Sequence, residues 1–212
     1  YISKDSRFYT GEHMGDIDSY KDMKACLEKA ARVLLVPEDG RVLLVRYPMK
    51  KFGRSVLGAF DVAMPVVHGT NVEDGTLMGL LEMLGVPYTG CDLTSSAAGM
   101  DKYLMKAALK QAGVPVLDAA VLSAREYMLD PAAGCARVEG RFPYPVIVKP
   151  VNLGSSVGIS YAGDRAALEE AMDNAFGFAS RVLVEPAEPN LPALNCAVLG
   201  VADEAEASVG QV

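Results

Sequence analysis

A lysine at the end of an apolar run, followed by a loop of glycine and serine, is the segment best suited to bind an anion. Lys149 follows the run Pro145–Val148, and the loop from Asn152 to Gly158 comes shortly after it. Glycines let successive backbone N–H groups turn toward one anion, serine hydroxyls add donors, and lysine supplies a point charge. The pattern predicts a phosphate site that is neither a Walker A loop nor a G-x-G-x-x-G turn. A surface hairpin with a lysine at its edge explains the same residues.

A second cation, Lys102, falls in the first turn of a helix expected from about Met100 to Ala112. The helix dipole disfavours a positive charge there by roughly 0.3–1 kcal/mol. A solvated lysine tolerates that cost, so Lys102 is either an exposed lysine or one that faces a ligand. Its neighbour Asp101 suits a helix start.

A histidine and an acid form the third candidate site. His68, one of two histidines, lies where an apolar segment opens into a glycine-containing loop that carries Glu73 and Asp74. Helix capping alone explains Asp74, and a buried structural histidine alone explains His68. The loop can also bring Glu73 to the imidazole, which would fix its tautomer and leave the other ring nitrogen for a substrate carboxylate.

The elements that must position these residues alternate between strand and helix. Two similar runs flank a turn that ends in Asp39-Gly40 and predict a hairpin. A mostly buried strand is expected at 60–67, and a helix with one apolar stripe follows and ends at Gly85. Other expected elements are helices at 16–30 and 164–176 and strands at 7–9, 116–122, 182–185, 194–199 and 207–209.

Composition narrows the class of protein. The 212 residues can form one large domain or two small ones. A net charge of −7 argues against non-specific nucleic-acid binding, and no apolar run approaches the roughly 18 residues that span a bilayer. The four scattered cysteines form no CxxC pair, so we expect no structural zinc and a reducing, cytoplasmic location. No signal peptide is visible, although the sequence begins at Tyr1 without a methionine.

Four motifs together resemble the D-alanine–D-alanine ligases, which are ATP-grasp enzymes of cell-wall precursor synthesis. Their order and spacing agree over most of residues 1–185. Independent surface features would not arise in this order, so the resemblance favours functional roles. The motifs are His68-Gly-x-x-x-Glu-Asp-Gly75, the run GLLEMLGVPYTG from Gly79 to Gly90, Ser95-Ser-Ala-x-x-Met-Asp-Lys102, and Lys149-Pro-x-x-x-Gly-Ser-Ser-Val-Gly158.

The resemblance implies a nucleotide site. Lys102 and Lys149 match lysines that contact nucleotide phosphates, and Glu185 matches an acid that reads the adenine amino group. Lys149→Met should therefore abolish most nucleotide affinity or turnover with little change in melting temperature, and equal loss of fold and activity would mean that Lys149 is structural. The loop that closes over the phosphates is matched by Gly154, Ser155, Ser156, Val157 and Gly158.

The resemblance also implies a catalytic site and a reaction. His68 and Glu73 match residues that hold the first D-alanine, and Ser155 matches a serine that organises the substrate. ATP would convert that D-alanine to an acyl phosphate, and a second D-alanine would attack it to give D-alanyl-D-alanine. The partners would be D-alanine and ATP, with no nucleic acid or membrane, and the family is usually a homodimer. Mg²⁺ is implied too, but its ligands are expected beyond Val212, so no metal ligand is assigned here.

The implied fold is the α/β ATP-grasp arrangement. Residues 1–98 would form an N-terminal three-layer α/β substrate-binding domain, residues 99–184 an α+β nucleotide-binding lid, and residues 185–212 the start of a C-terminal ATP-grasp domain. The strand–helix alternation before Gly99 and the helix-then-strands pattern after it agree with this division. One sheet running through both halves would contradict it.

Two departures from the family leave alternatives open. Val72 stands where glycine is usual, and a stretch with three prolines replaces the usual Gly-Arg-Glu after Glu185. The acid that grips the ribose would fall near Ala193, or Glu188 would replace it. The alternatives are a D-alanine–D-serine or D-alanine–D-lactate ligase, whose selecting loop would lie beyond Val212, and a non-catalytic relative that only binds nucleotide.

Overall fold

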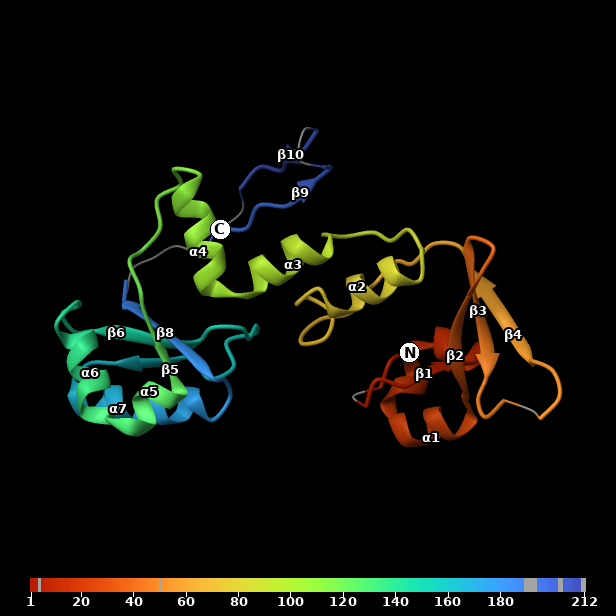
Figure 1. The fold of residues 1–212 in the computed structure, drawn as a ribbon, viewed down its shortest axis with the longest axis horizontal. Coiled ribbons are helices and arrows are strands. Elements are labelled where there is room, and N and C mark those ends of the chain that lie inside the picture. The colour runs from red at the N-terminus through yellow and green to blue at the C-terminus, as the bar shows by residue number, and fades with distance from the viewer. Residues whose placement is uncertain (4, 50, 189–193, 202–203, 211–212) are drawn as a thin grey trace. The chain divides into compact units, whose positions relative to one another are not determined.

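The computed structural model describes residues 1–3, 5–49, 51–188, 194–201 and 204–210 (Figure 1). The chain divides into two compact units. The first comprises Tyr1–Ala108 with Asn152–Ser155, and the second comprises Leu109–Val151 with Ser156–Val212. Each unit has its own four-stranded sheet, and in the described residues the two sheets share no strand. The single continuous sheet that would have contradicted the expected fold does not occur there.

The sheet of the first unit is antiparallel throughout, in the order β1 (Phe8–Thr10), β2 (Ala31–Glu38), β3 (Arg41–Arg46) and β4 (Val56–Phe60). The predicted hairpin is confirmed as β2 and β3, with Glu38 opposite Arg41. Asp39 and Gly40 have φ angles of 51° and 80°. Two consecutive positive φ angles suit the twist of a two-residue hairpin, and Asp-Gly accepts them readily.

The strand predicted at 60–67 is wrong in both extent and burial. β4 ends at Phe60, and beyond it Ala63 forms an isolated parallel bridge with Tyr88. Val62 is 62 % exposed, and Met64 and Val66 are each 76 % exposed. An apolar run marks a buried strand only where other layers cover it, and no layer among the described residues covers these side chains.

The helices of the first unit are η1 (Glu12–Gly15), η2 (Ile17–Lys21), α1 (Met23–Lys29), α2 (Thr76–Met83) and α3 (Leu93–Met100). The single helix expected at 16–30 is split, because the carboxylate of Asp22 accepts the Ala25 N–H at 3.0 Å and starts α1 afresh. Gly85 ends the helix region of α2 as predicted. With a φ of 68° at Gly85, the Val86 N–H reaches the Leu81 carbonyl at 3.1 Å.

α4 (Lys102–Gln111) begins in the first unit and runs into the second. It starts two residues later than predicted and ends before Gly113, as expected. α4 buries no residue, and its apolar residues Leu104, Ala107 and Ala108 are exposed, although their helical spacing favours one inward face. Its apolar spacing therefore does not mark a core contact among the described residues.

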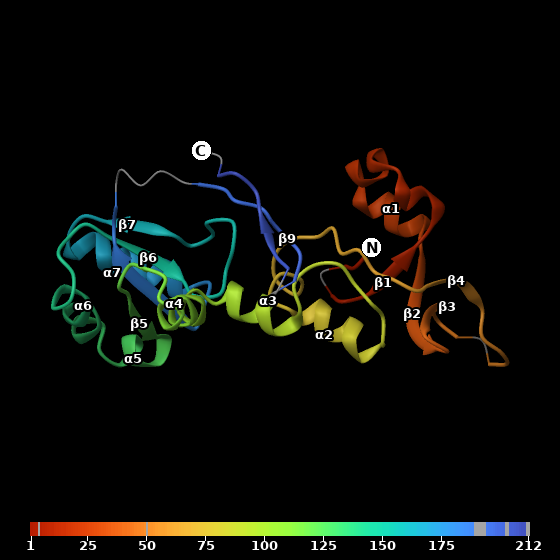
Figure 2. The ribbon, with the colours of Figure 1, turned by 90° about the horizontal axis from the view of Figure 1, so that it is seen from above.

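The second unit has an antiparallel sheet in the order β5 (Ala120–Ser123), β8 (Arg181–Pro186), β6 (Val146–Pro150) and β7 (Ser160–Ala162). Its helices are α5 (Ala124–Leu129), α6 (Pro131–Glu139) and α7 (Arg165–Phe176). Figure 2 shows these elements from above, with β7 along one edge of the sheet. The strands expected at 194–199 and 207–209 shrink to a short hairpin of β9 (Val198–Leu199) and β10 (Glu206–Ala207).

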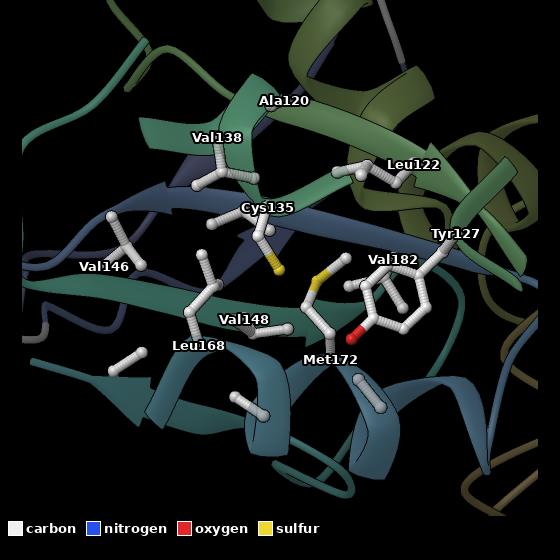
Figure 3. Packing of buried hydrophobic residues seen from close by; sticks show 14 of the residues in the cluster. Ala120, Leu122, Tyr127, Cys135, Val138, Val146, Val148, Leu168, Met172 and Val182 are labelled. Carbon is white, nitrogen blue, oxygen red and sulfur yellow. The ribbon is translucent and has the colours of Figure 1, made fainter. Parts of the chain in front are cut away.

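One face of this sheet packs on the three helices, and the other face carries Lys149 and Glu185 among apolar residues. Val146 and Val148 of β6, with Val182 and Val184 of β8, are fully buried against side chains of α5, α6 and α7 (Figure 3). Side chains alternate between the two faces of a strand. The opposite face is therefore formed by the residues between them, Ile147 and Lys149 on β6 and Leu183 and Glu185 on β8.

Candidate functional site

An ion pair lies on this opposite face of the second sheet. Ile147 is directly opposite Glu185 in the ladder, so Lys149 is the diagonal neighbour of Glu185. The Lys149 Nζ donates a hydrogen bond to Glu185 Oε1. The side chains are 23 % and 7 % exposed, respectively. A carboxylate this deeply buried is costly unless it is paired, and Lys149 provides a charge partner.

The loop after β6 has an unusual backbone. Ser155 and Ser156 have φ angles of 50° and 58°, and Gly158 has a φ of 69°. Non-glycine residues in this left-handed region cost of order 1–3 kcal/mol each, and such strain is often found where a ligand is bound. A Cβ at Gly158 would lie 2.8 Å from Pro150 Cγ and 2.9 Å from Phe178 Cδ2. Glycine is therefore required at 158 both by the backbone and by its neighbours.

Lys102 is tied to the beginning of that loop. Its Nζ donates a hydrogen bond to the Leu153 carbonyl, and both residues belong to the first unit. Asp101, only 7 % exposed, accepts the N–H groups of Tyr103 and Leu104 at 3.1 and 3.0 Å and so fixes the start of α4. The freely solvated lysine that the sequence allowed is not what the structure has.

The loop between β4 and α2 brings His68 and Glu73 together, as predicted. His68 Nδ1 lies 3.4 Å from Glu73 Oε1, and the Gly69 N–H donates to Glu73 Oε2 at 2.6 Å. The imidazole is 90 % exposed, so the alternative of a buried structural histidine is wrong. The Gly69 N–H and then His68 hold the pKa of Glu73 below its usual value.

Asp74 fixes the same loop rather than only capping α2. Its carboxylate accepts the Asn71 N–H at 2.8 Å and the Thr76 N–H at 3.0 Å. Burial raises the pKa of Asp74, but these hydrogen bonds outweigh burial and leave the pKa below its usual value. Gly75 follows with a φ of 86°, and a Cβ there would lie 2.6 Å from the Leu93 carbonyl oxygen.

A hollow of about 650 Å³ lies beside this loop, within the first unit. Its lining includes Phe8, Val67, His68, Asn71, Thr76 and Leu80. The lining is mostly apolar, and His68 supplies an exposed ring nitrogen at its edge. This combination suits a small ligand with a polar group that accepts or donates one hydrogen bond.

The structure divides the predicted site residues between the two units. His68, Glu73, Lys102, Gly154 and Ser155 belong to the first, and the second holds Lys149, Ser156, Val157 and Glu185. The position expected for the ribose acid, near Ala193, lies outside the described residues, while Glu188 is exposed. Among the residues that the structure describes, no three histidine, cysteine or acidic side chains gather as a metal site, and no helix is long and apolar enough to cross a membrane.

Sequence reasoning missed two features of the site. The pairing of Lys149 with Glu185 depends on the register between β6 and β8, which are separated by β7 and α7 in the chain. The bond from Lys102 to the Leu153 carbonyl joins residues 51 positions apart. The sequence did contain a signal for the Lys149–Glu185 pair, since a lysine and an acid near the ends of two apolar runs suit a diagonal pair across neighbouring strands.

Comparison with known proteins identifies the family. The model described as "D-ala D-ala ligase N-terminus" matches residues 1–91, and "D-ala D-ala ligase C-terminus" matches residues 108–212. The chain belongs to the D-alanine–D-alanine ligase family. The expected α/β ATP-grasp fold class is confirmed with it.

Relatives and solved structures agree with this family. A D-alanine–D-alanine ligase of Thermosipho melanesiensis is 38 % identical over 201 residues, which cover 94 % of this chain and 52 % of the relative. One from Acetivibrio thermocellus is 43 % identical over 152 residues, or 72 % of this chain and 40 % of the relative. The chain thus spans about half the length of the curated relatives that it matches.

Two solved structures resemble the chain in fold. The D-alanine–D-alanine ligase of Helicobacter pylori superposes with a TM-score of 0.79 at 26 % identity, covering 99 % of this chain and 60 % of that one. The VanG D-Ala:D-Ser ligase of Enterococcus faecalis gives a TM-score of 0.76 at 29 % identity, with coverages of 99 % and 57 %. Both names belong to ligases that act on D-alanine.

Proposed function

We propose that the full-length protein is an ADP-forming D-alanine–D-alanine ligase, a carbon–nitrogen ligase that supplies D-alanyl-D-alanine for peptidoglycan precursors in the cytoplasm. The observation that carries the proposal is the match of both halves of the chain to this family, with all four motifs among the described residues. The curated relatives that it resembles carry this name.

The residues fit a nucleotide by the chemistry of their donors and acceptors. In the first unit, Lys102 and the hydroxyl of Ser155 suit a phosphate, and in the second unit Lys149 and the hydroxyl of Ser156 do so. A buried carboxylate, Glu185, suits an exocyclic amine as its hydrogen-bond donor. Mg²⁺, when bound, would neutralise phosphate charge, and none of the described residues is assigned as its ligand.

In the proposed mechanism, this chain positions reactants and offsets charge. The carboxylate of the first D-alanine must approach the terminal phosphate of ATP, and the two anions repel each other. Lys102 and Lys149 would reduce that repulsion by contacting the phosphates, and the hydroxyls of Ser155 and Ser156 would orient the oxygens. Closure of the 154–158 loop would keep water from the acyl phosphate until the second amine attacks.

His68 and Glu73 act on the amino acid in this proposal. Glu73 would hold Nδ1 of the imidazole, which leaves Nε2 to contact the first D-alanine. The Gly69 N–H keeps the Glu73 carboxylate in place, so the imidazole has a fixed orientation. The hollow beside the loop has room for a small amino acid.

A phosphate-release assay on the full-length protein tests the proposal. ATP and D-alanine are supplied with D-alanine, D-serine or D-lactate as the second substrate, and L-alanine serves as the control. We expect release that depends on D-alanine and a dipeptide as the product. Nucleotide binding without D-alanine-dependent ADP formation would instead select the non-catalytic alternative.

A D-alanine–D-serine ligase is the second candidate. It is favoured by the similarity to the VanG D-Ala:D-Ser ligase, at 29 % identity over nearly the whole chain. Preference for D-serine over D-alanine at equal concentrations in the same assay would select it. The homodimer expected from the resemblance is also part of the proposal, and light scattering on the full-length protein measures it.

A further inference from the structure

The Lys149–Glu185 pair joins a cation proposed for phosphate to an acid proposed for the base. The two residues lie on β6 and β8, the inner strands of the β5–β8–β6–β7 sheet, which are joined by a ladder of five residue pairs. Their geometry is therefore held by paired backbone and not by a loop. A substitution at Lys149 is therefore expected to change the position of the Glu185 side chain, and the reverse.

We propose that Lys149 is a positioning residue for recognition of the nucleotide base, because its ammonium pairs with the Glu185 carboxylate and orients it as a hydrogen-bond acceptor. This inference rests on the proposed function, which places a nucleotide at the pair. It assigns Lys149 a second task beyond the phosphate contact. The base that it selects is a purine with an exocyclic amine.

The physical argument starts from the burial of Glu185, which is 5 % exposed. A buried carboxyl tends to keep its proton unless a nearby charge stabilises the anion. The ionised form only accepts hydrogen bonds, whereas the protonated form also donates one. A purine with an exocyclic amine needs the carboxylate as an acceptor, whereas a purine with a carbonyl at the same ring position needs the protonated carboxyl as a donor. The charge of Lys149 therefore affects which purine fits.

Orientation follows from the same contact. Glu185 Oε1 accepts from Lys149 Nζ, so one carboxylate oxygen is anchored and the rotation of the group is restricted. The ammonium approaches along β6 from the diagonal position, two residues beyond the one opposite Glu185. A ligand then meets an acceptor that is already in place, which lowers the ordering cost of binding.

Nucleosides separate this role from a phosphate contact, because adenosine and inosine carry no phosphate. Adenosine has an amine where inosine has a carbonyl. Each is measured as a competitor of ATP for the full-length protein, and the ratio of the two inhibition constants reports base selection alone. ADP binding is measured in parallel to report the phosphate contact.

We expect wild-type protein to prefer adenosine and Lys149→Met to reduce that preference by about tenfold, the effect of losing one charge-supported hydrogen bond. Lys149→Arg should restore the preference, since it keeps the charge. Lys149→Gln keeps a neutral donor and gives a second variant if the methionine protein folds poorly. Lys110→Met, the same change at an exposed lysine of α4, should leave the ratio unchanged.

The outcomes separate the inference from the proposed function. An unchanged nucleoside ratio in Lys149→Met and Lys149→Gln, with weaker ADP binding, would leave Lys149 as a phosphate ligand only and overturn the inference. The inference also fails if wild-type protein binds ADP but does not distinguish the nucleosides. A wild-type protein that binds no nucleotide would overturn the proposed function and the inference together.

Discussion

At the scale of single residues, each charged side chain of the candidate site contacts a specific partner, so a substitution removes a contact within the protein as well as a ligand contact. Lys149 contacts Glu185, Lys102 contacts the Leu153 carbonyl, and His68 contacts Glu73. Only the last of these contacts involves a strongly exposed side chain, His68. Stability and function should therefore separate cleanly at His68 and overlap at Lys149.

The exposed pair gives the first prediction. His68→Gln and Glu73→Gln should each weaken D-alanine use by roughly 10- to 100-fold with little effect on the KM for ATP, because the pair is proposed to touch the amino acid alone. Their combined loss should be smaller than the sum of the two, since Glu73 acts through the imidazole. Steady-state kinetics on the wild type, the two single variants and the double variant measure the losses in kcat/KM for D-alanine and the KM for ATP.

His13→Gln is the matched control for that experiment. The His13 Nε2 lies 2.9 Å from the Cys26 carbonyl, and His13 is outside the set of residues that line the hollow beside His68. It should lower the melting temperature slightly without changing D-alanine use. Losses at His68 and Glu73 that simply add, or that fall mainly on ATP, would contradict the pair.

Lys149→Met gives the second prediction, and the ion pair with Glu185 changes what we expect of its stability. The sequence alone predicted little change in melting temperature. Because the lysine is a charge partner of a buried carboxylate, we now expect the free energy of unfolding to fall by about 1–3 kcal/mol. Adding Glu185→Gln should recover part of that loss, and chemical denaturation of the three variants checks it. Equal stability of Lys149→Met and wild type would show that the pair is energetically neutral.

At the scale of elements, the loop that precedes α2 is held by carboxylates, so its order depends on pH. The folded pKa of Glu73 lies below the ordinary value of 4.5, and that of Asp74 lies below 3.8. Such groups stabilise the loop above their unfolded pKa, and this stabilisation is lost as the pH falls through the folded pKa. The chemical shift of the Gly69 amide, which donates to Glu73, should therefore change as Glu73 becomes protonated below pH 4.5 in an NMR series. In Glu73→Gln that titration should vanish, whereas Asp74→Asn should leave it in place.

The junction of this loop with α2 gives the fourth prediction. Gly75→Ala should lower the free energy of unfolding by about 1–2 kcal/mol or more, because a Cβ would meet the Leu93 carbonyl oxygen and the φ is positive. Gly99→Ala is the matched control, since a Cβ at this exposed position of α3 meets nothing within 4 Å. It should be neutral or stabilising by up to about 1 kcal/mol. Equal effects of the two alanines would argue against the contact.

The sequence predicts an element well when the residues that determine it lie within that segment, and poorly when contacts with distant segments determine it. The β2–β3 hairpin and α7 were predicted well, because Asp39-Gly40 and the Asp164 cap lie within the segments themselves. α3 was missed, since Ser, Thr and Gly in LTSSAAGM favour a loop. The exposure of residues 60–67 and the Lys149–Glu185 pair were not predicted. Both depend on which segments pack beside a strand, and one sequence alone does not reveal those neighbours.

At the scale of the whole molecule, the described core cluster belongs to the second unit, although side chains outside it, such as Leu129 at 78 %, are exposed there too. The second has one core cluster drawn from its own sheet and helices, with Leu122, Leu168 and Met172 at most 1 % exposed (Figure 3). In the first, Met64 and Val66 are each 76 % exposed. The domain boundaries predicted after residues 98 and 184 are separate from this division into units and stay predictions.

The core cluster of the second unit predicts that residues 109–188 will fold alone while residues 1–108 will be less stable. All four strands of the second sheet and the three helices that cover it lie within 109–188, so its core needs no residue from elsewhere. A single hydrophobic core in a domain of about this size rarely supplies more than about 3–5 kcal/mol, which is enough for a measurable transition. We expect 109–188 to show a cooperative thermal transition and dispersed amide signals, and 1–108 to melt at a lower temperature or to aggregate through its exposed apolar segment. A 109–188 fragment without a cooperative transition would show that its core depends on contacts from the rest of the chain.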